Sequence, residues 1–187
     1  MKRLNHRTKA VILSAVMAVL FIVIYISGIL IPEDAITGSF INAKCAPCPE
    51  HLFGTDALGR DLFLRTLKGL SVSITVGLVA SIISAVIAVL VGIAAATGSK
   101  YVDALINWII DLVMGVPHTI LIILISFALG RGLKGLLAGI AATHWCSLAR
   151  LIRGEVLQLR SQQYVAVSRK LGKSSGWILI NHLLPHL

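Results

Sequence analysis

The sequence predicts an all-α, polytopic membrane protein with about four transmembrane helices. Hydrophobic residues make up 57% of its 187 residues and charged residues only 13%, whereas soluble domains carry about 25% charged residues. Three long stretches contain no Lys, Arg, Asp or Glu, at residues 10–31, 69–99 and 112–130. Each is close to or longer than the ~20 residues that cross a bilayer core. In lipid, a single segment can pair all its own backbone hydrogen-bonding groups only if it forms a helix.

Residues 1–31 are predicted to form a cytosolic tail and the first transmembrane helix. A cleaved signal peptide is the alternative, because Lys2, Arg3, Arg7 and Lys9 precede the apolar stretch. However, its 22 uncharged residues exceed the roughly 7 to 15 apolar residues of a signal peptide, and no A-x-A-like site follows. We therefore expect a retained helix.

Residues 32–70 are predicted to form an external loop followed by an interfacial helix. Pro47, Pro49 and several small polar residues indicate a loop in the first half. From Leu58 onward, polar and apolar residues fall on opposite faces of a helix, as expected for a helix that lies along the membrane surface. The polar face holds Asp61, Arg65 and Lys68, and the apolar face holds Phe63, Leu67 and Leu70.

The rest of the chain, residues 71–187, is predicted to be an incomplete permease core. Its first span carries small residues that predict a packing ridge, because small side chains let helices approach closely in lipid. They are Ser73, Gly77, Ser81 and Ala85 in steps of four, followed by Ala88, Gly92 and Ala96.

Two further spans carry ionisable residues. Pro117 should kink or divide the span at residues 101–130, and Asp111 and His118 flank it. A fourth span at residues 136–149 contains His144 and must extend back through residues 132–133 to cross a bilayer. Because ionisable groups are costly in lipid, Asp111, Pro117, His118 and His144 are candidates for a translocation path, with structural pairing as the alternative. An intramembrane enzyme would require Asp111 and His118 to share one polar cavity.

The basic residues indicate the orientation rather than a nucleic-acid partner. The net charge is +9. With four spans and a cytosolic amino terminus, the inner segments hold 11 basic residues and the outer segments hold 6. The positive-inside rule therefore favours this orientation in the cell membrane.

Residues 150–187 are predicted to form a cytosolic helix-turn-helix. Tyr164, Val167 and Leu171 share one face of the first helix, and Gly172 should end it in a left-handed turn. Ser174 is positioned to cap the second helix, which Pro185 closes or redirects. Such a compact element is suited to docking into the groove of a partner protein.

Two separated motifs resemble those of one protein family. Residues 53–65, FGTDALGRDLFLR, resemble the signature FGTDxxGRDxxxR, with Gly54, Thr55, Asp56, Gly59, Arg60 and Asp61 as its signature residues. Residues 164–172, YVAVSRKLG, resemble a YVEAAxxxG coupling loop, and residues 182–185 match its HxLP ending. Residues 111–117 also match a DxxxxxP pattern. The chain thus resembles the second inner-membrane permease of ATP-binding-cassette importers for dipeptides, oligopeptides and nickel.

This resemblance implies a transport subunit that is not itself an enzyme. A second homologous permease, two ATP-binding subunits that hold ATP and Mg, an external solute-binding protein and membrane lipid would be its partners. The sequence has no complete G-x-x-x-x-G-K-[ST] phosphate loop, so we expect no cofactor bound by this chain. The resemblance also implies two further spans beyond Leu187. The residues expected to couple to the ATPase are Tyr164, Val165, Ala166, Ser168, Arg169 and Gly172.

The sequence leaves the substrate open between peptides and nickel or a nickel chelate, with a slight preference for nickel. The preference comes from the Thr143-His144-Trp145 and Ser174-Ser175-Gly176 runs and from the external C-x-x-C-x-x-H run of Cys45, Cys48 and His51. That run could bind a metal ion, its cysteines could form a disulfide outside the cytosol, or it could do neither. A membrane metal sensor or redox protein is therefore the alternative function. Ala166 departs from the family pattern, which has Glu there.

Overall fold

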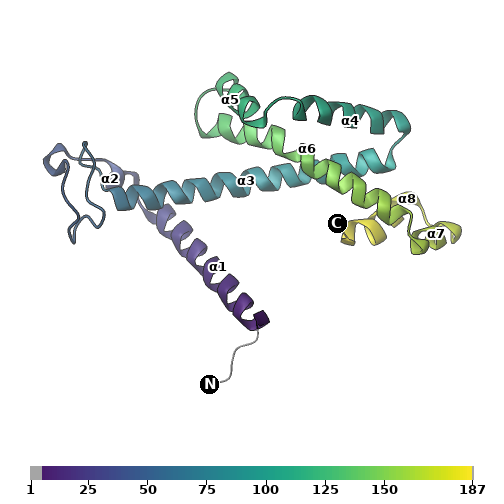
Figure 1. Ribbon diagram of the computed structural model, residues 1–187, viewed down its shortest axis with the longest axis horizontal. Coiled ribbons are helices and arrows are strands. Elements are labelled where there is room, and N and C mark those ends of the chain that lie inside the picture. The colour runs from purple at the N-terminus through teal and green to yellow at the C-terminus, as the bar shows by residue number, and fades with distance from the viewer. Residues whose placement is uncertain (1–5, 187) are drawn as a thin grey trace. The chain divides into compact units, whose positions relative to one another are not determined.

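The computed structural model describes residues 6–186, and in that range it consists of helices and loops without a named strand (Figure 1). The predicted all-α class is therefore confirmed. The helices in chain order are α1 (His6–Leu30), α2 (Glu33–Ile36), η1 (Phe40–Asn42), α3 (Leu62–Thr97), α4 (Lys100–Met114), α5 (His118–Ala128), α6 (Leu133–Arg160), α7 (Gln163–Lys170), α8 (Ser175–Ile178), the π-helical turn η2 (Leu179–Leu183) and η3 (Leu184–His186).

Three of the described helices are long and apolar enough to cross a membrane, namely α1, α3 and α6. A fourth span exists if α4 and α5 count together, because the pair meets the same criterion although it bends by 89°. Pro117 stands at the start of α5. The predicted division of this span at Pro117 is therefore confirmed, and so is the polytopic class.

The amphipathic segment after Leu58 does not form a separate interfacial helix. Residues 62–70 are the first turns of α3, which continues for 36 residues without a break. The polar face that we expected to contact lipid headgroups instead makes contacts within the chain. Arg65 pairs with Asp56, and Lys68 donates to the Ile31 carbonyl at 2.9 Å. The separation of polar and apolar residues on this segment therefore reflects packing against the preceding loop. The predicted boundary at residue 70 falls inside α3.

The chain divides into two compact units between Gly77 and Leu78. The first unit contains α1, the loop of residues 31–61 and the start of α3, and the second contains the rest of α3 and all later elements. We call residues 31–61 the external loop, after their predicted location.

The small-residue ridge of α3 is correct in its second half and wrong in its first. Ser73, Gly77 and Ser81 are exposed, whereas Ala88, Gly92 and Ala96 are buried. The buried row of small residues on α3 is Ala80, Ser84, Ala88, Gly92 and Ala96.

The core of the second unit joins its helices around α6. Val156 and Cys146 of α6 are fully buried, as is Val165 of α7. The cluster thus connects the part of α6 beside α5 with the helix-turn-helix that follows α6. Its members are Ala88, Ala96, Ile110, Cys146, Ala149, Ile152, Val156, Val165 and Ile178.

Helices α5 and α6 form an antiparallel hairpin with very close backbones (Figure 1). A Cβ added to Gly139 would lie 2.9 Å from the Ile122 carbonyl oxygen, so no larger residue fits without a backbone shift. Helix α6 starts at Leu133, as the predicted extension of the fourth span requires. It ends at Arg160, beyond the predicted end of the span at Ala149.

Candidate functional site

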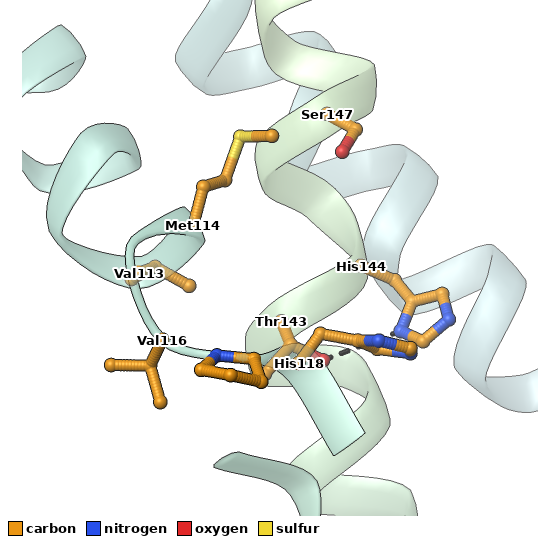
Figure 2. Close-up of a pocket in the computed structure, with 8 residues that line it drawn as sticks. Val113, Met114, Val116, His118, Thr143, His144 and Ser147 are labelled. Carbon is orange, nitrogen blue, oxygen red and sulfur yellow. Dashed lines mark hydrogen bonds between the residues drawn. The ribbon is translucent and has the colours of Figure 1, made fainter. Parts of the chain in front are cut away.

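A pocket of about 430 Å³ opens where Pro117 separates α4 from α5 and where both face α6. It is lined by Val113, Met114, Val116, Pro117, His118, Thr143, His144 and Ser147 (Figure 2). Three of the four predicted path residues, Pro117, His118 and His144, therefore lie together in one cavity. The proline break brings them together because it turns α5 back along α6.

The two histidines lie against each other in this pocket (Figure 2). Their ring centroids are 5.5 Å apart at an interplanar angle of 72°. The Nδ1 atom of His144 lies 3.2 Å from the Ile140 carbonyl oxygen, which can only accept a hydrogen bond. A proton on Nδ1 satisfies this contact, so the His144 imidazole adds a polar group to a pocket with largely apolar walls.

Asp111 does not line this pocket. Its Oδ1 atom lies 2.5 Å from Nη2 of Arg150 on α6, and both side chains are largely exposed. This ion pair is the structural pairing that the sequence analysis gave as the alternative role for Asp111. The pocket that His118 lines is therefore not the cavity shared with Asp111 that an intramembrane enzyme would need.

The strongest ion pair between α4 and α6 is one that the sequence analysis missed. Arg153 donates from Nε and Nη2 to the two carboxylate oxygens of Asp103, each at 2.6 Å. A polar stripe on α4 was the available signal, because Lys100, Asp103, Asn107 and Asp111 recur at helical spacing. Its two aspartates pair with arginines of α6. This stripe explains why the span is apolar on one side only.

The turn after α7 has the predicted form. Gly172 has φ of 77°, in the left-handed region that a glycine adopts without steric cost. The Gly172 N–H donates to the Arg169 carbonyl and the Lys173 N–H to the Ser168 carbonyl, at 3.0 and 3.1 Å. This pair of bonds is a Schellman motif. Ser174 accepts from the Trp177 N–H at 3.2 Å, which confirms it as the cap.

The apolar face of Tyr164, Val167 and Leu171 does not pack within the described chain. Tyr164, Val167 and Leu171 are exposed, and Leu171 keeps 73% of its accessible surface. Val165 is the buried anchor instead. Ala166 and Arg169 are also exposed, and Ser168 donates its hydroxyl to the Tyr164 carbonyl at 2.9 Å. The second helix is regular only over Ser175–Ile178. His182 and Leu183 of the HLLP run follow in η2, and their side chains are outside the described part of the chain.

The signature residues connect separate parts of the external loop to one another. Thr55 donates its hydroxyl to the Asn42 carbonyl and accepts from the Cys45 N–H at 2.9 Å. Thr55 also forms an isolated bridge with Asp61. Gly59 fits directly against the Ser39 carbonyl oxygen, which a Cβ would approach to 1.8 Å. The role of the signature is therefore to close this loop over the start of α3.

Asp56 is the electrostatic centre of the loop. Its carboxylate accepts hydrogen bonds from the backbone N–H groups of Leu58 and Arg60, at 2.8 and 3.0 Å. It also pairs with the side chains of Arg60 and Arg65, both at 2.8 Å. The hydrogen bond from the Arg60 N–H, helped by the one from the Leu58 N–H and by the Arg60 side chain, lowers the pKa of Asp56 to about 2.

Asp61 caps α3 and holds His51. Its Oδ1 accepts from the Leu64 N–H at 3.0 Å and its Oδ2 lies 2.8 Å from Nδ1 of His51. Burial raises the pKa of Asp61, but hydrogen bonds from the Leu64 N–H and from His51 outweigh burial, so that this pKa lies below its ordinary value.

The predicted metal site at Cys45, Cys48 and His51 is not formed. The described residues contain no group of three or more His, Cys, Asp or Glu side chains that could hold a metal ion. His51 is engaged by Asp61, and both cysteines are free thiols rather than a disulfide. The sequence spacing was misleading because a tight turn that runs from Cys48 to His51 aims the histidine at the start of α3.

The fold and the pocket define a helical membrane protein with a cavity between a broken span and its neighbour. Residues 88–187 match the model of the family described as binding-protein-dependent transport system inner membrane component, and the chain belongs to this family.

Two relatives from Bacillus subtilis (strain 168) are similar over most of the chain. The dipeptide transport system permease protein DppC is 32% identical over 185 residues, which are 99% of this chain and 58% of the relative. The oligopeptide transport system permease protein OppC is 35% identical over 153 residues, which are 82% of this chain and 50% of the relative. The chain thus spans between half and three fifths of the length of these two relatives.

Proposed function

We propose that this chain is a permease subunit of an ATP-binding-cassette importer and that its substrates are peptides. The observation that carries the proposal is the family match over residues 88–187, which include every residue of the two-histidine pocket. The similarity to permease proteins of dipeptide and oligopeptide transport systems supports the substrate class. Nickel has less support, because His51 is engaged by Asp61 and no three-ligand group is present among the described residues.

In this proposal the pocket at Pro117, His118 and His144 is part of the translocation path. The imidazole of His144 and the hydroxyl groups of Thr143 and Ser147 offer hydrogen bonds to peptide groups that have left water, at a position where apolar walls alone would leave those groups unpaired.

The α7 helix is the proposed contact for an ATP-binding subunit. Its exposed Tyr164, Val167 and Leu171 form an apolar face beside the basic Arg169. Val165 anchors the other side of α7 in the cluster that contains Cys146, next to Ser147 of the pocket. A displacement of α7 by nucleotide-driven closure therefore reaches the pocket through rigid packing along α6.

The remaining partners follow from the same proposal. A second permease would complete the path, two ATP-binding subunits would hold ATP and Mg, and a solute-binding protein would deliver substrate outside. The amino terminus is proposed to be cytosolic, in agreement with the basic residues on the inner segments.

Uptake measurements in the native host test this function. Cells that carry the complete transport operon, with and without this gene, are supplied with a radiolabelled dipeptide or with nickel. We expect the deletion to abolish dipeptide uptake and to leave nickel uptake unchanged, with restoration by the gene on a plasmid. Normal dipeptide uptake together with lost nickel uptake would move the proposal from peptides to nickel.

A further inference from the structure

A second pocket, of about 240 Å³, lies at the opposite end of the α5–α6 hairpin from the two histidines. Its walls are largely apolar and its side-chain polar groups are the Ser126 hydroxyl and the Arg131 guanidinium. The lining residues are Ile122, Ile123, Ser126, Phe127, Arg131, Gly132 and Leu136.

Arg131 is held over an aromatic ring but has no acidic partner among residues 6–186. Its guanidinium carbon lies 4.6 Å from the centroid of the Phe127 ring. By contrast, Arg60, Arg65, Arg150 and Arg153 all pair with carboxylates within the described chain. A stacked guanidinium keeps its N–H groups free at its edge, so Arg131 is oriented to receive an anion.

The form of the pocket selects the kind of anion. A guanidinium binds a carboxylate through two parallel hydrogen bonds, and the apolar side chains around it suit an alkyl or aromatic group attached next to that carboxylate. We propose that Arg131 receives the terminal carboxylate of a peptide substrate and that Ile122, Phe127 and Leu136 receive its last side chain. This inference rests on the proposed peptide transport and adds a recognition site to it.

The two pockets follow one face of the hairpin. Leu136 of the second pocket and Thr143 of the first are seven residues apart on α6, so they face within about 20° of the same direction and lie about 10 Å apart along the axis. An extended tripeptide spans about 10 Å. A peptide whose carboxylate binds Arg131 can therefore extend along the hairpin towards His118 and His144.

Uptake of a peptide and of its carboxyl-terminal amide tests this site. The complete transporter is reconstituted in vesicles, and uptake of alanyl-leucine is compared with that of alanyl-leucine amide. For Arg131→Ala we expect the KM of the free acid to rise about 10- to 100-fold, the loss expected for a charge-assisted hydrogen-bonded pair, and the KM of the amide to stay unchanged. Arg131→Lys should show a smaller rise, because it keeps the charge and loses the paired geometry.

Lys134→Ala is the matched control. It removes the same charge three residues further on, from a side chain that does not line the pocket, and we expect the KM of the free acid to change less than twofold. The amount of each variant that is inserted and monodisperse in detergent is measured first. If the Arg131→Ala variant is not inserted, the amide and free acid are compared as competitors on the unchanged transporter, where the free acid should inhibit at least 10-fold more strongly.

The outcomes separate the possible failures. Equal KM values for acid and amide in the unchanged transporter, or an equal effect of Arg131→Ala on both, would overturn the carboxylate site while leaving peptide transport intact. Loss of the Arg131 effect in vesicles without anionic lipid would mean that a phospholipid phosphate, not the peptide, is the anion. Absence of any peptide uptake by the unchanged transporter would overturn the proposed function itself.

Discussion

Gly59 shows most directly what a signature residue does in the external loop. Its φ of 70° lies in the left-handed region, where an L-residue with a side chain pays roughly 1–2 kcal/mol. A Cβ there would also lie 1.8 Å from the Ser39 carbonyl oxygen. Both constraints require glycine, so this signature position is explained by backbone geometry rather than by contact with a ligand.

We predict that Gly59→Ala opens the external loop, because the backbone must leave its left-handed conformation and Ser39 must move. Limited proteolysis should cut within residues 42–61 in the variant before the unchanged protein is cut, and thermal unfolding in detergent should begin about 2–8 °C lower. Gly69→Ala is the control, because Gly69 is helical and has open space around it. An equal response of the two variants would contradict this account.

Asp56 makes the external loop sensitive to acid. Its folded-state pKa of about 2 lies below its ordinary value of 3.8, so the deprotonated carboxylate stabilises the folded loop. This contribution is complete above about pH 4 and is lost as the pH falls from there through the folded-state pKa of about 2. We predict that pepsin cuts the loop of the unchanged protein increasingly faster as the pH falls from 4 to 2.

The matched variant for this prediction is Asp56→Asn. It removes the charge at every pH, so its loop should already be cut rapidly at pH 4, and the ratio of the two cleavage rates should approach one near pH 2. Because pepsin activity acts equally on both proteins, this ratio reports on the loop. A ratio that stays constant over the range would refute a role for the Asp56 charge.

At the scale of elements, the α5–α6 hairpin depends on close backbone contact at Gly139. Without a hydrophobic driving force between helices in lipid, such contact is a main source of association. A Cβ at Gly139 would lie 2.9 Å from the Ile122 carbonyl, whereas Gly154 of the same helix has nothing within 4 Å. The two glycines therefore offer a clean comparison of packing with helix propensity.

We predict that Gly139→Ala destabilises the protein by about 1–3 kcal/mol, because the backbones must separate. Gly154→Ala should be neutral or stabilising by up to about 1 kcal/mol, since alanine is the better helix former. Thermal unfolding in detergent measures both. Both pockets lie on this hairpin, so Gly139→Ala should also reduce peptide uptake. A Gly139→Ala variant as stable as the Gly154→Ala variant would show that α5 and α6 do not pack as described.

At the scale of the whole molecule, the orientation decides which end of the hairpin meets the substrate first. In the proposed orientation, with the amino terminus in the cytosol, the external loop and Arg131 would lie outside and α7 would lie inside, where the ATP-binding subunits are proposed to dock. Cys45 is an exposed thiol in the external loop, and Ser161 is an exposed residue between α6 and α7.

We predict that a membrane-impermeant maleimide labels Cys45 in intact spheroplasts when Cys48→Ser and Cys146→Ala leave it as the single thiol. A cysteine placed by Ser161→Cys, with all three native cysteines replaced, should be labelled only after the membrane is permeabilised. Mass spectrometry of the labelled peptides measures both. The reverse pattern would invert the proposed orientation.

The sequence alone predicted the membrane class, the break at Pro117 and the turn at Gly172. Each of these features depends on the local sequence. The membrane class follows from the length of the uncharged stretches, the break from the backbone N–H that proline lacks, and the turn from the absence of a Cβ in glycine. The start of α6 near Leu133 belongs to the same group, because the length needed to cross a bilayer fixed it.

Only the tertiary structure decided which faces meet. It buried Val165, one of the residues expected to couple to the ATPase, and it paired Asp111 with Arg150 while bringing His118 to His144. It also showed that His51 contacts Asp61 and does not join the two cysteines in a metal site. Apolar periodicity is a property of one helix, whereas each of these contacts depends on where a second, distant segment lies, and a nearly uniform apolar sequence carries little record of that position.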